Sequence, residues 1–268
     1  MLGSPIAHSL SPVLHRAAYA ELGLQHWSYT AFECPSDALA DRLANARIAS
    51  GFGGYSLTMP LKLTALPLVD DLEPLARTVG AVNTVVPLDG RLVGCNTDVG
   101  GMVSALHAAG IADVRAPTVL GGGGSARAAL AALAVLGADT VRVLMREPAK
   151  AAPLRQIADA VGVTLVVEPW GRPEDTDLIV STVPAGAADP LAELLDHFAW
   201  PGSAALFDIL YHPWPTPLAG VAQRAGVVVV GGLDLLAAQA VGQVELMTGH
   251  VVDVEVLLSA GRRALAAS

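Results

Sequence analysis

The second half of the chain contains six short runs rich in β-branched and other apolar residues. These runs cover residues 118–120, 141–145, 164–167, 178–181, 204–208 and 227–230. Alanine- and leucine-rich segments with a helical pattern lie between several of them. Such alternation is typical of a parallel sheet whose strands are joined by right-handed helical crossovers. We therefore predict an α/β fold.

The first hundred residues also alternate between helical and extended patterns. Helices are expected near 12–22 and 36–49, and extended segments at 27–33, 51–58, 81–87 and 91–95. A further helix starts at Val99, where Asp98 is placed to cap it. Because 268 residues suit two domains, we predict one domain over 1–100, completed by the mostly helical segment 235–268, and a second over 101–234.

The composition disfavours several classes of protein. Lys and Arg number 16 against 25 Asp and Glu, and the formal charge of -9 argues against a nucleic-acid-binding or membrane-binding surface. Asp139 and Asp234 interrupt the most apolar stretches before they could span a bilayer, and the start of the chain lacks a signal-peptide pattern. Cys34 and Cys95 lie far apart and the His residues form no ligand motif, so we expect no disulfide framework and no metal site. We expect a soluble, cytoplasmic protein, and a monomer and a homodimer both remain open.

The stretch His8-Ser9-Leu10-Ser11-Pro12 directly precedes the first helical pattern. Ser before Pro is an ordinary helix entry, so Ser11 is expected to cap the helix, with Pro12 in its first turn. Capping leaves Ser9 unexplained, and a helix N-terminus with two spare hydroxyls also suits a small anion. These residues alone favour capping and leave the anion site open.

A glycine cluster lies between the run at 118–120 and an alanine-rich helical segment. It reads Gly121, Gly122, Gly123, Gly124, Ser125, Ala126, Arg127. Glycine lets the backbone turn sharply and approach a pyrophosphate, while the helix N-terminus adds positive potential. A flexible turn is the plain alternative, but the strand-turn-helix context predicts a dinucleotide-binding site.

The end of the next expected strand indicates which dinucleotide is bound. An acidic residue there would accept a hydrogen bond from a ribose 2′-hydroxyl, whereas a cation would bind a 2′-phosphate. Arg146 stands at about that position and Arg127 offers a second cation, so we predict NADP as the cofactor. Glu147 keeps NAD open, and each arginine could instead be a solvated helix end.

Several motifs follow one another in a fixed order along nearly the whole chain. They are GSPIAHSLSP at 3–12, SLTMPLK at 56–62, AVNT at 81–84, NTD at 96–98, GGGGSAR at 121–127, DILYHP at 208–213, TPL at 216–218, and the segment 232–239. With these motifs the chain resembles the shikimate dehydrogenase family. The resemblance implies a substrate-binding α/β domain over 1–100, a Rossmann-like NADP-binding domain over 101–234, and reversible NADP-dependent reduction of 3-dehydroshikimate to shikimate in chorismate and aromatic amino-acid biosynthesis.

The resemblance also implies roles for individual residues. Ser9 and Ser11 would bind the substrate carboxylate, with Tyr211 near the same end of the substrate. The residues that would line the polyol ring are Thr58, Lys62, Asn83, Asp98 and Gln239. The residues that would bind the cofactor are Gly121, Gly122, Gly123, Gly124, Ser125, Arg127, Arg146 and Gly232. Taken singly, each has a plain structural explanation, such as a surface amine for Lys62 or a helix cap for Asp98.

The chemistry of the implied reaction calls for such a group independently. Reducing a ketone requires a hydride at carbon and a proton at oxygen, and a lysine ammonium can supply that proton. Asp98 would orient the ammonium of Lys62, and no metal is needed. Lys62 and Asp98 are therefore the predicted catalytic residues.

Some positions depart from the family pattern, and other functions stay open. Ser56 stands where many members have Asn, Met145 where Asn is common before the arginine, and Leu235 where Met is frequent. A quinate or aminoshikimate dehydrogenase, with NAD in place of NADP, is one alternative. A non-catalytic dinucleotide-binding regulator is another, although the presence of both Lys62 and Asp98 argues against it.

The turn at Gly3-Ser4-Pro5 is expected to follow a strand, as ligand loops do in open α/β sheets. Only Met1 and Leu2 precede it, whereas a strand usually needs about five residues. We therefore expect the native start to lie a few codons upstream, with Met1 at an internal strand position.

Overall fold

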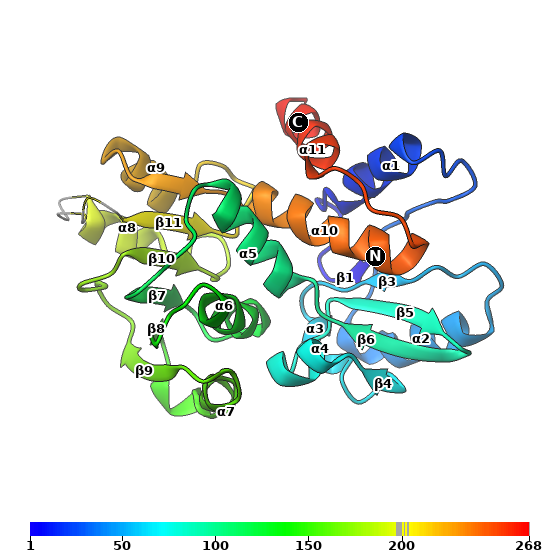
Figure 1. Cartoon of the computed structure of the whole chain (residues 1–268), viewed down its shortest axis with the longest axis horizontal. Helices are drawn as coiled ribbons and strands as arrows, with labels where there is room; N and C mark the ends of the chain where they lie inside the picture. The colour runs from blue at the N-terminus through cyan, green and yellow to red at the C-terminus, as the bar shows by residue number, and fades with distance from the viewer. Residues whose placement is uncertain (197–199, 201, 203, 268) are drawn as a thin grey trace. The chain divides into compact units, whose positions relative to one another are not determined.

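The computed structural model describes residues 1–196, 200, 202 and 204–267, which form two compact units (Figure 1). The first unit comprises 1–101 and 236–267, and the second comprises 102–235. The chain passes from the first unit to the second within helix α5 (Asp98–Ala108) and returns within helix α10 (Gly232–Thr248). The first unit is therefore completed by the C-terminal part of the chain.

The strands of the first unit are short and pair in a mixed pattern. β1 (Leu2–Gly3) pairs in parallel with β2 (Phe32–Glu33), and a parallel bridge joins Leu2 to Leu57. A second sheet has the order β3 (Tyr55–Ser56), β5 (Thr84–Leu88), β6 (Arg91–Cys95) and β4 (Asp71–Leu72). In it, β5 is antiparallel to both neighbours and β4 is parallel to β6. The bridge at Leu57 places the loop after β3 beside the first strand.

The helices of the first unit pack in two apolar clusters. Besides α5 and α10 they are α1 (Ser11–Glu21), the 3-10 helix η1 (Ser36–Ala38), α2 (Leu39–Ile48), α3 (Leu61–Thr64), α4 (Pro74–Val79) and α11 (Val254–Ala266). One cluster joins α1, α10 and α11 through residues such as Leu14, Val244 and Leu257. The other packs α2 against the strands through Leu43 and Val85. Most side chains of both clusters are aliphatic, and Tyr19 and Tyr29 add aromatic rings to the cluster around α1.

The second unit contains a six-stranded parallel sheet in the order β12-β11-β10-β7-β8-β9. Its strands are β7 (Pro117–Leu120), β8 (Thr140–Met145), β9 (Thr164–Pro169), β10 (Leu178–Ser181), β11 (Ala205–Asp208) and β12 (Val228–Val230). The chain runs outward from β7 to β9 and then returns to β10 on the opposite side of β7. This order is that of a doubly wound Rossmann-like sheet, with the reversal between β7 and β10. The predicted α/β fold with a parallel sheet is confirmed.

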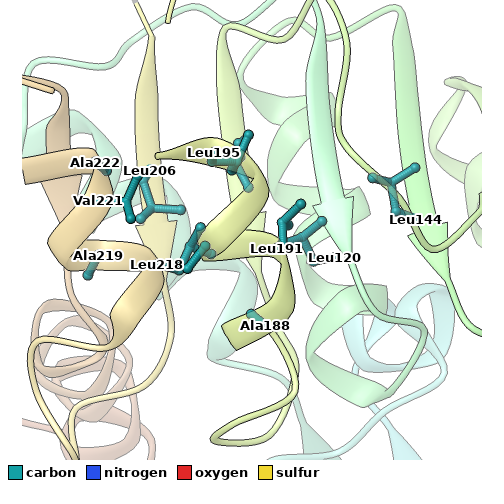
Figure 2. Close-up of a cluster of buried hydrophobic side chains, with 12 residues drawn as sticks. Leu120, Leu144, Ala188, Leu191, Leu195, Leu206, Leu218, Ala219, Val221 and Ala222 are labelled. Atoms are coloured by element: carbon teal, nitrogen blue, oxygen red, sulfur yellow. The ribbon is translucent and has the colours of Figure 1, made fainter. Parts of the chain in front are cut away.

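Helices cover both faces of this sheet (Figure 1). They are α6 (Gly124–Val135), the 3-10 helix η2 (Pro148–Lys150), α7 (Ala152–Val161), α8 (Asp189–Leu195) and α9 (Pro217–Arg224). Figure 2 shows Leu191 and Leu195 of α8 and Leu218 of α9 together with Leu120 and Leu206 of the strands. The strands β7, β10 and β11 are buried at every position, and strands buried on both faces are expected to be apolar throughout, which explains why these three appeared in the sequence as continuous runs.

Two predictions about helix caps are wrong. The N-cap of α1 is Leu10, and Ser11 is already a helical residue whose side chain caps nothing. Instead, the hydroxyl of Ser9 accepts a hydrogen bond from Ser11 N at 3.3 Å. At α5, the side chain of Asn96 rather than that of Asp98 accepts from the first amides. The cap position of α1 is thus an apolar residue and the first amides of α5 are bonded by Asn96, so backbone geometry rather than residue type decides the cap.

The strand before the Gly3-Ser4-Pro5 turn is shorter than the usual length of about five residues. β1 has two residues, both buried, and Met1 N donates to Thr30 O at 2.7 Å. Among the described residues, no helix combines the length and the apolar character needed to cross a membrane.

Candidate active site

Lys62 and Asp98 form a close ion pair in the first unit. Lys62 lies on the short helix α3, and Asp98 is the first residue of α5. The Nζ atom of Lys62 lies 2.5 Å from Oδ2 of Asp98, with 17% of the lysine side chain and 7% of the aspartate side chain exposed. The ammonium is therefore largely shielded from water while its partner is almost fully buried. A lysine held in this way cannot be explained as a solvated surface amine.

Asn96 frees the carboxylate of Asp98 for this contact. Its Oδ1 accepts from the backbone amides of Asp98 and Val99 at 3.0 and 3.3 Å, which are the bonds of a helix N-cap. Its Nδ2 donates to Ala81 O at 2.9 Å, which ties the start of α5 to the segment before β5. Because the cap is supplied two residues earlier, neither carboxylate oxygen of Asp98 is needed for it. The sequence signal for this cap was an Asn two residues before the helix.

Asn83 connects this carboxylate to the polar groups around it. Its Nδ2 donates to Asp98 Oδ1 and to Thr97 Oγ1, both at 2.9 Å, and lies 3.4 Å from Gln239 Oε1. Its Oδ1 accepts from Thr97 N at 2.8 Å and from the hydroxyl of Thr84 at 2.9 Å. Both ends of the amide therefore have fixed partners, so its orientation is determined by the hydrogen-bond network. Asn83 is 1% exposed, which makes each of these bonds costly to lose.

Gly101 allows Gln239 to reach this cluster. A Cβ atom at Gly101 would lie 2.8 Å from the Cβ and from the backbone N of Gln239. The backbones of α5 and α10 can approach this closely only because Gly101 has no side chain. No sequence signal identifies Gly101, since a glycine inside a helical pattern is not specific for a close helix contact.

The remaining predicted substrate residues of this unit lie outside that bonded cluster, among the residues described. Ser9 Oγ donates to Met1 Sδ at 3.0 Å, and Ser11 is buried at the start of α1. Thr58 N donates to Leu2 O at 3.0 Å, and a Cβ at Gly3 would lie only 2.3 Å from the Thr58 methyl group. Gly3 thus lets the first strand lie directly against the loop that carries Thr58. The roles of Ser9, Ser11 and Thr58 stay predictions.

In the second unit, the glycine cluster follows β7 at the point where the strand order reverses. Gly121 has a φ of +105°, and a Cβ there would lie 2.9 Å from the hydroxyl oxygen of Thr182. A Cβ at Gly122 would lie 2.9 Å from the terminal methyl of Met145, whereas the space in front of Gly123 is open to 4 Å. Gly124 and Ser125 begin α6, which directs its N-terminal amides to this turn. Side-chain-free backbone at a helix N-terminus is what an incoming phosphate requires.

Two cations and one carboxylate follow β8 at the predicted cofactor-specificity position, and a third cation lies on α6. Arg146 directly follows β8 and is exposed, and Arg127 lies in the first turns of α6. Burial lowers the pKa of Arg127 below its ordinary value. The Nζ of Lys150 lies 2.8 Å from Glu147 Oε2, and this contact holds the pKa of the Glu147 carboxyl below its usual range. Lys150 therefore offsets the negative charge of Glu147, the residue for which NAD remained an alternative cofactor.

The loop with Tyr211 is fixed by a buried carboxylate at the end of β11. Thr216 Oγ1 donates to Asp208 Oδ2 at 2.7 Å and accepts from Ala219 N at 3.0 Å as the N-cap of α9. Burial raises the pKa of the Asp208 carboxyl. Tyr211 belongs to the second unit and Lys62 to the first, and the role of Tyr211 stays a prediction.

Gly232 has a packing reason for being glycine. A Cβ at this position would lie 2.1 Å from the carbonyl oxygen of Ile209, so no side chain fits where α10 begins. Its amide donates to Leu210 O at 3.1 Å. The backbone of α10 thus starts directly against the loop after β11. A cofactor contact of Gly232 stays a prediction.

Comparison with known proteins agrees with this organisation. The family model described as the shikimate dehydrogenase substrate binding domain matches residues 1–85. The NADP(+) shikimate dehydrogenase of a strain of Thermus thermophilus is 40% identical, covering 99% of this chain and 97% of that protein. The chain belongs to the shikimate dehydrogenase family.

Solved structures of the family share the whole fold. Shikimate dehydrogenase of Mycobacterium tuberculosis superposes with a TM-score of 0.88 at 38% identity, covering 98% of this chain and 97% of that one. Shikimate 5-dehydrogenase of Thermus thermophilus, solved in complex with NADP(H) and shikimate, gives a TM-score of 0.84 at 38% identity, covering 98% and 97%. Family membership makes the protein an NADP-dependent oxidoreductase of the Rossmann-like class.

Proposed function

We propose that this protein catalyses the reversible NADP-linked reduction of 3-dehydroshikimate to shikimate, a step of chorismate and aromatic amino-acid biosynthesis. The observation that carries the proposal is the ion pair of Lys62 and Asp98, whose carboxylate also accepts from the amide of Asn83. Membership of the shikimate dehydrogenase family supports the choice of substrate.

Lys62 is assigned the proton transfer. Reduction of the ketone places a proton on the carbonyl oxygen, and the ammonium of Lys62 donates it; in the oxidation direction the lysine accepts it from the hydroxyl. An ammonium has three hydrogens, and Asp98 uses one of them, so two remain for the substrate. Asp98 holds the lysine and binds the neighbouring hydroxyl. When bound, the nicotinamide supplies or accepts the hydride at the reacting carbon.

The substrate is held by hydroxyl and amide groups of the first unit. Ser9 and Ser11, at the N-terminus of α1, are assigned to the substrate carboxylate, since a helix N-terminus favours an anion. The groups assigned to the ring hydroxyls are those of Thr58, Asn83 and Gln239, and Tyr211 is assigned to the carboxylate end. Binding energy from these contacts positions the reacting carbon.

The residues around the β7–α6 turn fit a dinucleotide phosphate. Side chains at Gly121 and Gly122 would meet Thr182 and Met145, and the space beside Gly123 is open to 4 Å, so this stretch of backbone carries no side chain that would block a phosphate. Gly124, Ser125 and Gly232 complete the proposed cofactor-contacting set. The exposed Arg146 and the partly buried Arg127 are assigned to the 2′-phosphate, because a guanidinium matches phosphate geometry.

Initial rates with two substrates and two cofactors test this proposal. Shikimate and quinate are each oxidised with NADP and with NAD, and the proposed function predicts the highest kcat/KM for shikimate with NADP. Faster oxidation of quinate, or a preference for NAD, would identify a paralogue with a different substrate or cofactor. No turnover in any of the four combinations would favour a non-catalytic regulator. A cytoplasmic location stays a prediction, to be checked by cell fractionation, and light scattering decides between a monomer and a homodimer.

A further inference from the structure

The hydrogen-bond network of Asn83 continues past the candidate active site into the interior of the first unit. The hydroxyl of Thr84 donates to Asn83 Oδ1 at 2.9 Å and accepts from Gln243 Nε2 at 3.2 Å. The other end of that amide, Gln243 Oε1, accepts from the hydroxyl of Ser56 at 2.8 Å. The hydroxyl of Tyr29 in turn donates to Ser56 Oγ at 2.5 Å. A continuous series of side-chain bonds therefore leads from Tyr29 to Asn83.

Each member of this series has a single consistent direction. A tyrosine hydroxyl donating to Ser56 leaves the serine hydrogen for Gln243 Oε1, and the amide hydrogens of Gln243 then face Thr84. Thr84 passes its own hydrogen to Asn83 Oδ1. The Nδ2 group of Asn83 is thereby directed to Asp98, which holds Lys62.

His15 supports the same direction from the other side of Gln243. Its Nε2 lies 3.2 Å from Gln243 Oε1, an oxygen that has no hydrogen to give, so the imidazole nitrogen is the donor. The ring of His15 stacks on that of Tyr29 with centroids 3.8 Å apart. The orientation of the Gln243 amide is thus set by two donors, Ser56 and His15.

All members of the series are buried. Their exposed fractions are 0% for His15, 4% for Ser56, 0% for Thr84 and 2% for Gln243, and Tyr29 is 6% exposed. Buried polar groups are stabilising only when their partners are in place, so alternative orientations of these amides are disfavoured. Such a network can hold a neighbouring side chain in one orientation.

We propose that Thr84 and Gln243 are positioning residues, which fix the amide of Asn83 so that its Nδ2 faces Asp98 and keeps the carboxylate directed to Lys62. The sequence analysis had no role for either residue. The proposal rests on the assignment of Lys62 and Asp98 to the proposed reaction, and it explains how Ser56 is used in a chain that departs here from the usual Asn.

The effect of the series is partial, because Asn83 Oδ1 has a second donor. The backbone amide of Thr97 also bonds this oxygen, at 2.8 Å, and would remain in any variant of Thr84 or Gln243. Loss of one of two bonds predicts a reduction in kcat on the order of 10-fold, the size of one buried hydrogen bond, rather than complete inactivation.

Two substitutions at Thr84 distinguish a positioning role of its hydroxyl from a packing role of its methyl group. Thr84→Val keeps the shape and removes the hydroxyl, whereas Thr84→Ser keeps the hydroxyl and removes a methyl group. If the hydroxyl positions Asn83, Thr84→Val lowers kcat about 10-fold with a smaller change in KM, and Thr84→Ser stays near wild type despite a lower melting temperature. Equal rates in the two variants, or a slower serine variant, would overturn the proposal.

Substitution of Gln243 provides a second variant should Thr84→Val fold poorly. Gln243→Met is close in volume and removes every contact of the amide, those of Nε2 to Thr84 and to the Asn83 carbonyl and those of Oε1 to Ser56 and His15. The kcat is therefore expected to fall as it does for Thr84→Val. Wild-type kcat in a folded Gln243→Met protein would contradict the positioning role.

Hydrogen exchange of the Asn83 side-chain amide tests the geometry without using activity. In protein labelled with 15N at asparagine, the Nδ2 hydrogens of Asn83 are expected to exchange slowly in the wild type and in Thr84→Ser, and faster in Thr84→Val. Unchanged exchange in Thr84→Val would overturn the proposal whatever the enzyme's substrate is. A wild-type protein that does not oxidise shikimate, by contrast, would contradict the proposed function alone.

Discussion

Asp98 holds the ammonium of Lys62 through one carboxylate oxygen and the amide of Asn83 through the other, at 2.5 and 2.9 Å. The pair forms although the two residues lie 36 positions apart in the sequence, because Asn96 caps α5 and leaves the carboxylate free. Asn96 therefore caps the helix, and Asp98 is left to hold the proton-transferring Lys62.

Asn96→Ala is expected to destabilise the first unit. The substitution removes the N-cap of α5 and also leaves the buried carbonyl of Ala81 without its amide donor. Together these losses predict a decrease of roughly 1–3 kcal/mol in the free energy of unfolding, measured by urea denaturation. A free energy within error of the wild type would contradict the assignment of Asn96 as the cap.

Gly101→Ala and Gly100→Ala form a matched pair in the same helix. A methyl group at Gly101 would meet the backbone of Gln239 at 2.8 Å, whereas nothing lies within 4 Å of one at Gly100. We expect Gly101→Ala to lower stability by about 1–3 kcal/mol and to raise the KM for shikimate. Gly100→Ala is expected to leave KM unchanged and to stabilise the helix slightly. Similar behaviour of the two variants would show that the approach of α10 does not depend on Gly101.

His15 is expected to make stability depend on pH. Burial lowers the pKa of His15 from 6.5 to about 3, so the unfolded chain binds a proton at this residue between these values and the folded chain does not. The stabilisation is fully present above pH 6.5 and is lost progressively as the pH falls towards 3. Between pH 7 and pH 5 the wild type should lose about 2 kcal/mol more than His15→Phe, which keeps a ring against Tyr29 but cannot titrate.

Urea denaturation at the two pH values measures this difference. His250→Phe, the same substitution at an exposed histidine, serves as the control. The same loss in the wild type and in His15→Phe would show that His15 is protonated in the folded protein.

Arg146→Ala is expected to weaken NADP binding far more than NAD binding. Only NADP has the 2′-phosphate that a guanidinium at the end of β8 would bind, and a charge-assisted hydrogen bond predicts an increase in Kd on the order of 10-fold or more. The control is Arg224→Ala, which removes an exposed arginine paired with Asp196 on another part of the second unit. Fluorescence titration measures both cofactors, and equal losses for NADP and NAD would contradict the role of Arg146.

The strands of the second unit could be predicted from the sequence better than those of the first unit. Each of the six strands of the second unit produced an apolar run, and β7, β10 and β11 did so because a strand buried on both faces is apolar throughout. In the first unit β1, β2, β3 and β4 have two residues each, too few to produce an alternating pattern. Their positions follow from tertiary pairing, so the long extended segments expected there were not found.

The site could be predicted only in part for a similar reason. The motifs identified Lys62, Asn83, Asp98 and Gln239, and hydrogen bonds join these four side chains in the structure. Which of two neighbouring polar residues caps α5 depends on backbone geometry that residue types do not encode. Gln243 bonds Thr84 from 159 residues away, so no local pattern could have connected them.

The kcat of Lys62→Ala tests most directly the central claim that Lys62 transfers the proton. We predict that kcat for shikimate oxidation falls on the order of 100-fold or more while the Kd for NADP stays near wild type, since general acid–base catalysis typically contributes 10²–10⁴. Arg77→Ala, which removes an exposed ion-paired cation of the same unit, is the control and should retain full activity. A Lys62→Ala protein that is folded and has near-normal kcat would contradict the account.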